Sequence, residues 1–295
     1  MTEVATSDQL LVVIDPVARQ TDGEAVRIAK DVLSGGAATK VCLPDGPEEF
    51  ARALARRGSR RPVVIGDDRA LVRAVSFLHR QRELAGCVLS VVPVGSALSV
   101  ARSLGVPTGT VAAARAVLDG TERRLDLLVD DSDGVVLGAL RIPPLPVFRT
   151  PEEPEPSADP AHPWLRTCQS LVRTLVPSRP TRPPRGPSPV AAPRPGPSRL
   201  RVEVDGVTLV DLDQPVEAVS VTPGGAGAAA VEVRPASVGA EAAPLLARGR
   251  LVTVSGADFR YRADAGIWGP VRRRTWTVRE GGLGLTLPSS LPSSR

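Results

Sequence analysis

The stretch Leu10-Leu-Val-Val-Ile14 is a continuous apolar run, which is typical of a strand that is buried on both faces of a sheet. Residues 22–33 follow it with apolar side chains at helical spacing. The same alternation continues outward to residue 142. It predicts strands at 39–43, 62–66 and 88–93, helices at 47–57, 68–82, 96–104 and 110–118, and a closing hairpin of 125–129 with 134–142. We therefore expect an α/β domain over residues 9–142, with a doubly wound parallel sheet that binds ligands beyond the carboxyl ends of its strands.

Composition changes abruptly after this domain. Residues 143–197 hold 17 of the 30 prolines, and a stretch of this kind cannot bury a core. We predict a disordered Pro/Arg-rich linker over residues 143–198, interrupted by a short helix-like stretch at 164–175. Arginines without any acidic residue fill the interval between Asp159 and Glu203. This suits a solvated linker, and also an attachment to anionic lipid headgroups.

From residue 199 to residue 288, apolar and polar residues alternate in short runs that Gly, Pro and Asp separate. Alternation of this kind is typical of strands that bury one face. We expect strands at 200–207, 218–222, 230–234, 249–255, 259–263, 273–278 and 283–287. Together they predict a C-terminal all-β, sandwich-like domain over residues 199–288.

Bulk composition limits the classes of function. The 295 residues carry a net charge of +5 with only two lysines, Lys30 and Lys40, so the positive charge is almost all arginine. The lack of a motif that mixes aromatic and basic residues argues against a nucleic-acid partner. Cys42, Cys87 and Cys168 have neither the spacing of metal ligands nor that of a disulfide framework. No apolar run approaches the roughly 18 residues of a spanning helix, so we expect a cytoplasmic protein that contacts the inner membrane face peripherally.

Three turns of the first domain carry residues of the kind that hold a nucleotide. Asp15-Pro16 follows the first strand, Gly66-Asp-Asp-Arg-Ala70 the third, and Pro93-Val-Gly-Ser96 the fourth. The last turn continues into Val100-Ala-Arg-Ser-Leu-Gly105. In this order, the turns resemble the catalytic domain of diacylglycerol kinases and related lipid kinases. Tyr261-Arg-Ala-Asp264 resembles that family's closing strands, so the resemblance spans both domains but not the linker.

The resemblance implies an ATP-dependent transfer of phosphate to the hydroxyl of a diacylglycerol-like lipid, with Mg²⁺ neutralising charge. It gives Asp68 a catalytic and metal-binding role and places Asp264 in the lipid-acceptor site. The resemblance also assigns contacts with the nucleotide to five residues: Asp15, Gly66, Arg69, Gly95 and Ser96. The expected partners are therefore a nucleotide and a diacylglycerol-like lipid, beside an anionic membrane.

The chain departs from the family pattern at each motif. Gly-Gly-Asp-Gly-Thr reads Gly66-Asp-Asp-Arg-Ala70, so two glycines that let a backbone approach phosphate are lost. Asn-Asp reads Leu98-Ser99, and Asp-Gly-Glu reads Asp264-Ala-Gly266. We expect a lipid kinase of weak or no activity, or a non-catalytic pseudokinase or scaffold that binds nucleotide or anionic lipid. Two further hypotheses are a working kinase in which Arg69 replaces the backbone contacts, and a membrane adaptor that uses the linker.

The same residues also have purely structural interpretations. Asp68 suits the N-cap of the helix at 68–82, and Ser96 that of the helix at 96–104. Asp264-Ala-Gly266 reads as a β-turn. Two further families share parts of the architecture. NAD kinases also join an α/β domain to a β-rich one, whereas dinucleotide-binding dehydrogenases need a G-x-G-x-x-G after the first strand, which this chain lacks.

Overall fold

Four parallel strands make up the N-terminal part of the sheet in the computed structural model, which describes residues 9–144, 196–236 and 243–289. β1 (Leu10–Ile14) lies between β2 (Thr39–Cys42) and β3 (Arg61–Gly66), and β4 (Val88–Pro93) pairs with the other side of β3. All residues of β1 are buried, because strands inside a parallel sheet are covered on both faces. The sequence pattern therefore predicted these four strands almost residue for residue, although β2 is partly polar.

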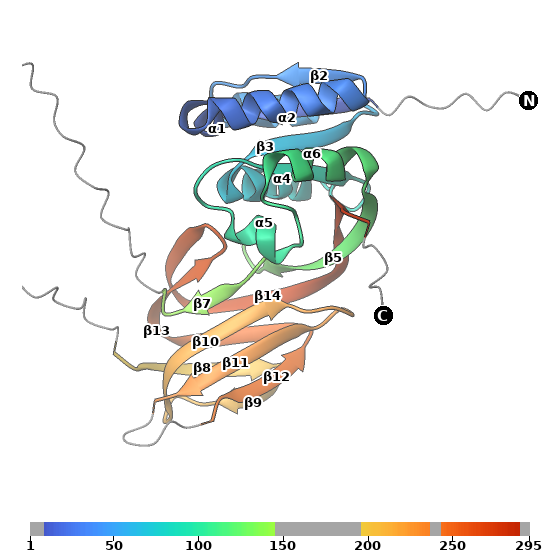
Figure 1. The fold of residues 1–295 in the computed structure, drawn as a ribbon. Coiled ribbons are helices and arrows are strands. Elements are labelled where there is room, and N and C mark those ends of the chain that lie inside the picture. Colours follow the sequence, from blue (N-terminus) through green and yellow to red (C-terminus); the bar gives the residue numbers. More distant parts are fainter. Residues whose placement is uncertain (1–8, 145–195, 237–242, 290–295) are drawn as a thin grey trace, which may run out of the picture. The chain divides into compact units, whose positions relative to one another are not determined.

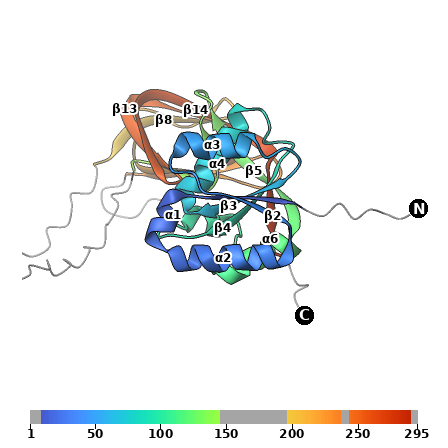
Figure 2. The ribbon, with the colours of Figure 1, turned by 90° about the horizontal axis from the view of Figure 1, so that it is seen from above.

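Helices cover both faces of this part of the sheet (Figure 2). Val12 and its neighbours on one face pack against α2 and α6, whereas Val13 on the other face packs against α3 and α4. Successive side chains of a strand point to opposite faces, which is why every position of β1 is apolar. The predicted parallel sheet with helices on both sides is confirmed. The four covering helices are α2 (Gly23–Gly36), α3 (Pro47–Ala55), α4 (Asp68–Arg80) and α6 (Thr110–Asp119).

The other strands form the β-rich part of the molecule (Figure 1). They are β5 (Thr121–Asp130), β6 (Val135–Val136), β7 (Leu140–Ile142), β8 (Ser198–Val204), β9 (Val207–Val210), β10 (Pro215–Pro223), β11 (Ala229–Pro235), β12 (Leu245–Gly249), β13 (Leu251–Ala263) and β14 (Gly266–Leu287). Along β8, β10 and β11, buried residues alternate with less buried ones, because one face packs on an apolar core around Trp276. Residues 196–236 and 243–289 contain no helix, in agreement with the predicted all-β character.

The long strand β14 joins the two parts of the sheet. It pairs antiparallel with β13 and β5, and near its end Gly284 and Leu285 pair parallel with β4. A buried hydrogen bond of 2.8 Å from Ser90 Oγ to Thr286 Oγ1 reinforces this junction. The result is one continuous 14-stranded sheet. All described residues belong to one compact unit, and the predicted domain boundaries at residues 142 and 199 stay predictions.

Several local features differ from the sequence-based expectations. The two strands expected at 273–278 and 283–287 are a single strand, because a register shift after Arg279 absorbs the intervening residues without ending the pairing. Short α1 (Pro16–Thr21) and the strands β9 and β12 were not predicted, and α5 (Ser99–Ser103) is shorter than expected.

The predicted linker at 143–198 and its helix-like stretch at 164–175 fall almost wholly outside the described residues, as does Cys168. None of the helices in the described ranges has the length and apolar composition that a transmembrane span requires.

Candidate functional site

The turns after β1, β3 and β4 meet at one edge of the sheet, as the sequence predicted. The backbone N–H of Asp15 donates to the Ile65 carbonyl at 2.9 Å, and that of Val94 donates to the Gly66 carbonyl at 3.0 Å. A Cβ atom added at Gly66 would lie 2.6 Å from the Cβ of Ala70 and 3.0 Å from that of Asp15. Only glycine fits there, because atoms cannot approach so closely.

The turn after β4 reaches the same place. Gly95 adopts φ +126°, in the region that favours glycine, and an added Cβ would lie 3.2 Å from the Cβ of Asp67. Ser96 beside it is exposed. The three turns that the sequence analysis singled out therefore share one location.

Asp67, and not Asp68, caps the helix α4. One carboxylate oxygen of Asp67, Oδ1, accepts the backbone N–H groups of Arg69 at 3.0 Å and Ala70 at 3.1 Å. The prediction that Asp68 is the N-cap is therefore wrong, because the residue before it has the extended backbone and the free side chain that a cap requires. The first amides of a helix are also where proteins bind phosphate. Here a carboxylate of the chain itself occupies them.

Asp68 points into the protein instead. Its carboxylate is 1% exposed and accepts hydrogen bonds from the start of α5. Oδ2 accepts from Ser99 Oγ at 3.1 Å and from the Val100 N–H at 2.9 Å, and Oδ1 accepts from the Ala101 N–H at 3.0 Å. Asp68 thus supplies the cap of α5, whose own N-cap position, Leu98, has no side-chain hydrogen bond. The prediction that Ser96 caps this helix is wrong, because α5 begins at Ser99 and its cap comes from Asp68.

Asp15 is buried and paired. Its Oδ1 accepts the N–H of Val17 at 2.9 Å, which caps α1, and its Oδ2 forms an ion pair of 2.6 Å with Nη1 of Arg73 on α4. The Arg73 guanidinium also lies over the ring of Phe50, 5.5 Å from its centre. Both carboxylate oxygens of Asp15 are therefore already engaged within the protein.

Asp264 lies in the turn between β13 and β14, which confirms its interpretation as a turn residue. It has φ +47°, and its carboxylate accepts the N–H groups of Leu137 and Gly138, each at 2.7 Å. Burial raises the pKa of Asp264, these backbone donors lower it, and the nearby charge of Asp68 raises it further. Asp264 thus fastens the β13–β14 turn to the segment between β6 and β7.

The residues of this edge can be compared with what the binding of ATP and Mg²⁺ requires. Among the described residues, no cluster of three or more His, Cys, Asp or Glu side chains could hold a metal ion. Asp68 faces backbone donors, and Asp67 places negative charge where a phosphate group would meet the amides of α4. Like charges at contact distance repel. The residues of this edge therefore do not fit a magnesium-bound triphosphate, although Arg69 is exposed beside it.

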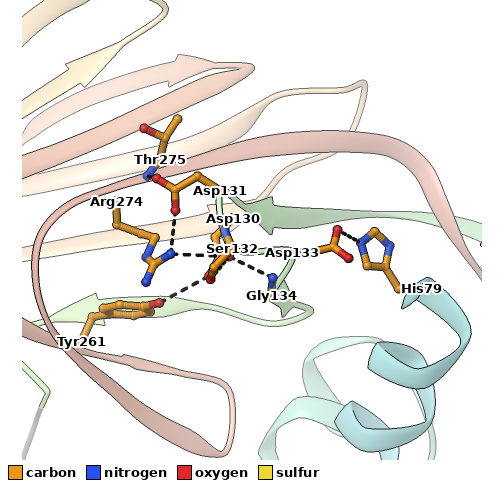
Figure 3. A network of polar contacts seen from close by, with 9 residues as sticks. All are labelled: His79, Asp130, Asp131, Ser132, Asp133, Gly134, Tyr261, Arg274 and Thr275. Atoms are coloured by element: carbon orange, nitrogen blue, oxygen red, sulfur yellow. Dashed lines mark hydrogen bonds and ion pairs between the residues drawn. The ribbon is translucent and has the colours of Figure 1, made fainter. Parts of the chain in front are cut away.

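Sequence reasoning missed a second polar network, which Figure 3 shows. Asp130 accepts the N–H groups of Ser132 and Gly134 through Oδ1, and Arg274 of β14 forms an ion pair of 2.6 Å with Asp131. His79 of α4, which lies on no ligand-spaced motif, contacts Asp133 at 2.8 Å and lowers the pKa of that carboxyl group.

The only signal for this network in the sequence is the run of residues 131–134, which predicted a hairpin turn. The network joins α4, the β5–β6 turn and β14, so we interpret it as structural.

The phenol of Tyr261 gives this network a measurable signature. Its oxygen lies 3.4 Å from Asp130 Oδ2, and its ring stands edge-on to Trp276 with the ring centres 5.3 Å apart. Burial raises the pKa of Tyr261 to about 12, with further raising by the charge of Asp130 and a counteracting effect of Arg274.

Because Tyr261 is the only tyrosine of the chain, phenolate absorbance reports on it alone. We expect a midpoint of about 12 for the folded protein and of about 10 in denaturing urea. The folded-state pKa lies above the unfolded-state value, so Tyr261 favours unfolding as the pH rises above about 10. A midpoint near the ordinary value in the folded protein would contradict the buried position, and Tyr261→Phe supplies the baseline.

Comparisons with known proteins agree with this geometry on the fold. Residues 9–129 match the family model of the diacylglycerol kinase catalytic domain. No curated protein matches the chain by sequence. Among solved structures, the chain is similar to a "putative diacylglycerol kinase" from Bacillus anthracis str. Sterne, with a TM-score of 0.66 and 12% identity over 97% of this chain and 99% of that one. Another structure, of a diacylglycerol kinase from the same organism, has a TM-score of 0.65 and 11% identity over 97% of this chain and 99% of that one.

Proposed function

Because residues 9–129 of this chain belong to the diacylglycerol kinase catalytic domain family, we propose that the protein is a pseudokinase. It keeps the fold of a lipid kinase and acts by binding, without transferring phosphate from ATP to a lipid.

A single observation carries this proposal: the Asp67 carboxylate accepts the N–H groups of Arg69 and Ala70 at the start of α4. Phosphoryl transfer from ATP needs backbone amides and a metal held by carboxylates close to the phosphates. Here the amides are satisfied by an anionic side chain, and the carboxylate of Asp68 caps α5. Both groups are therefore engaged before any nucleotide arrives.

A phosphate-transfer assay tests the proposal. The protein is incubated with radiolabelled ATP, Mg²⁺ and mixed lipid vesicles that contain diacylglycerol, and labelled lipid is separated and counted. We expect no labelled lipid above the blank without protein. Labelled lipid that increases with protein concentration would overturn the proposal, provided that the label disappears when a site residue is changed.

Arg69 is the right residue for that control, because it is exposed and forms no ion pair with any residue that the structure describes. Arg69→Ala therefore leaves the fold intact, whereas a change at the buried Asp68 would confuse loss of activity with loss of folding. Arg69 also carries the second candidate function, a working lipid kinase in which its guanidinium replaces the lost backbone contacts to phosphate. Lipid labelling that Arg69→Ala abolishes would establish this second function.

A further inference from the structure

A cavity lies at the opposite end of α4 from the three turns. It has a volume of about 520 Å³ and is lined by residues that follow or end α4 and by residues of β5 and β14. α4 has 13 residues, which places its two ends roughly 18 Å apart. The cavity is therefore separate from the edge that carries the family motifs.

Basic side chains from three parts of the fold surround this cavity: His79 and Arg82 at the end of α4, Arg250 between β12 and β13, and Arg279 in β14. Among the described residues that line it, Glu280 is the one acidic residue, and its contact with Arg250 is a long one of 3.8 Å between two exposed side chains. An exposed ion pair of this kind contributes little free energy. The cavity thus has an excess of positive charge.

Two of these cations are not held in close ion pairs with described residues, although the charge of Arg82 acts on Asp133 and lowers the pKa of that carboxyl group. Within residues 9–144, 196–236 and 243–289, neither Arg82 nor Arg279 forms an ion pair, whereas His79 contacts Asp133. A guanidinium presents several N–H donors in one plane, and this geometry suits the oxygens of a phosphate group. Two such guanidinium groups beside one cavity indicate an anionic ligand.

The backbone of Arg82 supports the same inference. Arg82 follows the end of α4 with φ +60°, and the helix closes through bonds from the Arg82 N–H to the His79 carbonyl and from the Glu83 N–H to the Leu78 carbonyl, both 2.9 Å. Glycine is the usual residue at this position of such a closure, since a side chain there is strained. A strained residue beside a cavity points to a role for its side chain.

The opposite wall is fixed by the irregular stretch of β14. A register shift lies between Arg279 and Leu283, and Asp126 holds it by accepting the N–H of Gly281 at 2.8 Å. The other oxygen of Asp126 accepts the N–H of Gly227, also at 2.8 Å. Arg279 therefore belongs to a segment that these hydrogen bonds hold in place beside the cavity.

The rest of the lining is apolar. Leu84, Leu127 and Val278 line the cavity and are at most 5% exposed. A volume of this size is in the range of small-molecule sites, in which an apolar wall holds the body of a ligand and a few polar groups orient it. We propose that this cavity binds a phosphate-bearing amphiphile, with the phosphate between Arg82 and Arg279 and an aliphatic chain against these three side chains.

A titration with n-octyl phosphate tests the proposal. We expect saturable binding by isothermal calorimetry, and weaker binding of inorganic phosphate, which leaves the apolar wall uncovered. Arg82→Gly removes a cation and relieves the strained backbone, so it should weaken binding about tenfold or more while the midpoint of thermal unfolding stays the same or rises. Arg279→Gln should weaken binding to a similar extent. Arg115→Gln, on the exposed surface of α6, is the matched control and should change nothing.

A second arm separates the two sources of such a phosphate. Vesicles of phosphatidylglycerol in phosphatidylcholine that sediment the normal protein but not Arg82→Gly would place the phosphate on a membrane lipid. Equal sedimentation of both proteins, together with a loss of octyl phosphate binding in Arg82→Gly, would place it on a soluble compound. The proposal is overturned when octyl phosphate does not bind, or binds equally to all four proteins.

Discussion

Replacing Asp68 by alanine should lower the free energy of unfolding by about 3 kcal/mol, because it removes a buried cap and leaves amides without partners. The Asp68 carboxylate is 1% exposed and accepts from Ser99, Val100 and Ala101. The bonds from Val100 and Ala101 are buried, so the N–H groups of these two residues would lose their partners. Urea unfolding followed by circular dichroism measures the change.

Two control variants make this result specific. Asp68→Asn keeps one acceptor oxygen, so part of the cap remains. Its free energy of unfolding should fall by roughly half as much as that of Asp68→Ala. Asp31→Ala removes an exposed carboxylate whose ion pair with Arg27 is 3.4 Å long, and should change the stability by less than about 0.5 kcal/mol. If Asp68→Ala proved as mild as Asp31→Ala, Asp68 would be free for a ligand and the structural role given to it here would be wrong.

Replacing Asp67 by glycine should create an affinity for polyphosphate that the normal protein lacks. The change frees the N–H groups of Arg69 and Ala70, removes a negative charge from the start of α4, and clears the space beside Gly95. A like charge about 4 Å from a phosphate costs on the order of 1–4 kcal/mol, so the affinity should rise about fivefold to several hundredfold. Glycine is itself an acceptable N-cap, so the cost in stability is only a few tenths of a kcal/mol.

The measurement is a calorimetric titration with tripolyphosphate, and with ATP in the presence of Mg²⁺. Asp67→Asn is the informative control, since it removes the charge but keeps an oxygen that caps the same amides. It should bind more weakly than Asp67→Gly. No gain in either variant would mean that something other than Asp67 closes the site.

The sequence was a good guide wherever a single physical rule decides the outcome. The strands β1, β3 and β4 followed from the rule that a strand covered on both faces is apolar throughout, and their buried residues obey it apart from Ser90. The meeting of the three turns followed from parallel pairing, which brings the carboxyl ends of strands to one edge. Local patterns were sufficient in these cases.

Long-range contacts explain what could not be predicted. Asp67 and Asp68 both satisfy the pattern of a helix cap, and the sequence could not show that Asp68 is turned toward Val100, which lies 32 residues away. In the same way, Asp15 pairs with Arg73 over 58 residues and Asp264 with Leu137 over 127. The strand β14 was read as two because Gly281 and Gly282 resemble a turn, whereas in the fold they form an irregularity within continuous pairing.

The central claim is that the carboxylate of Asp67 occupies the amides at which a kinase would hold phosphate. An amide-resolved NMR titration of the normal protein with ATP and Mg²⁺ observes these groups directly. We predict that the backbone N–H signals of Arg69 and Ala70 stay in place up to millimolar ATP, while in Asp67→Gly they move and saturate. Saturable shifts of these two signals in the normal protein would contradict the claim.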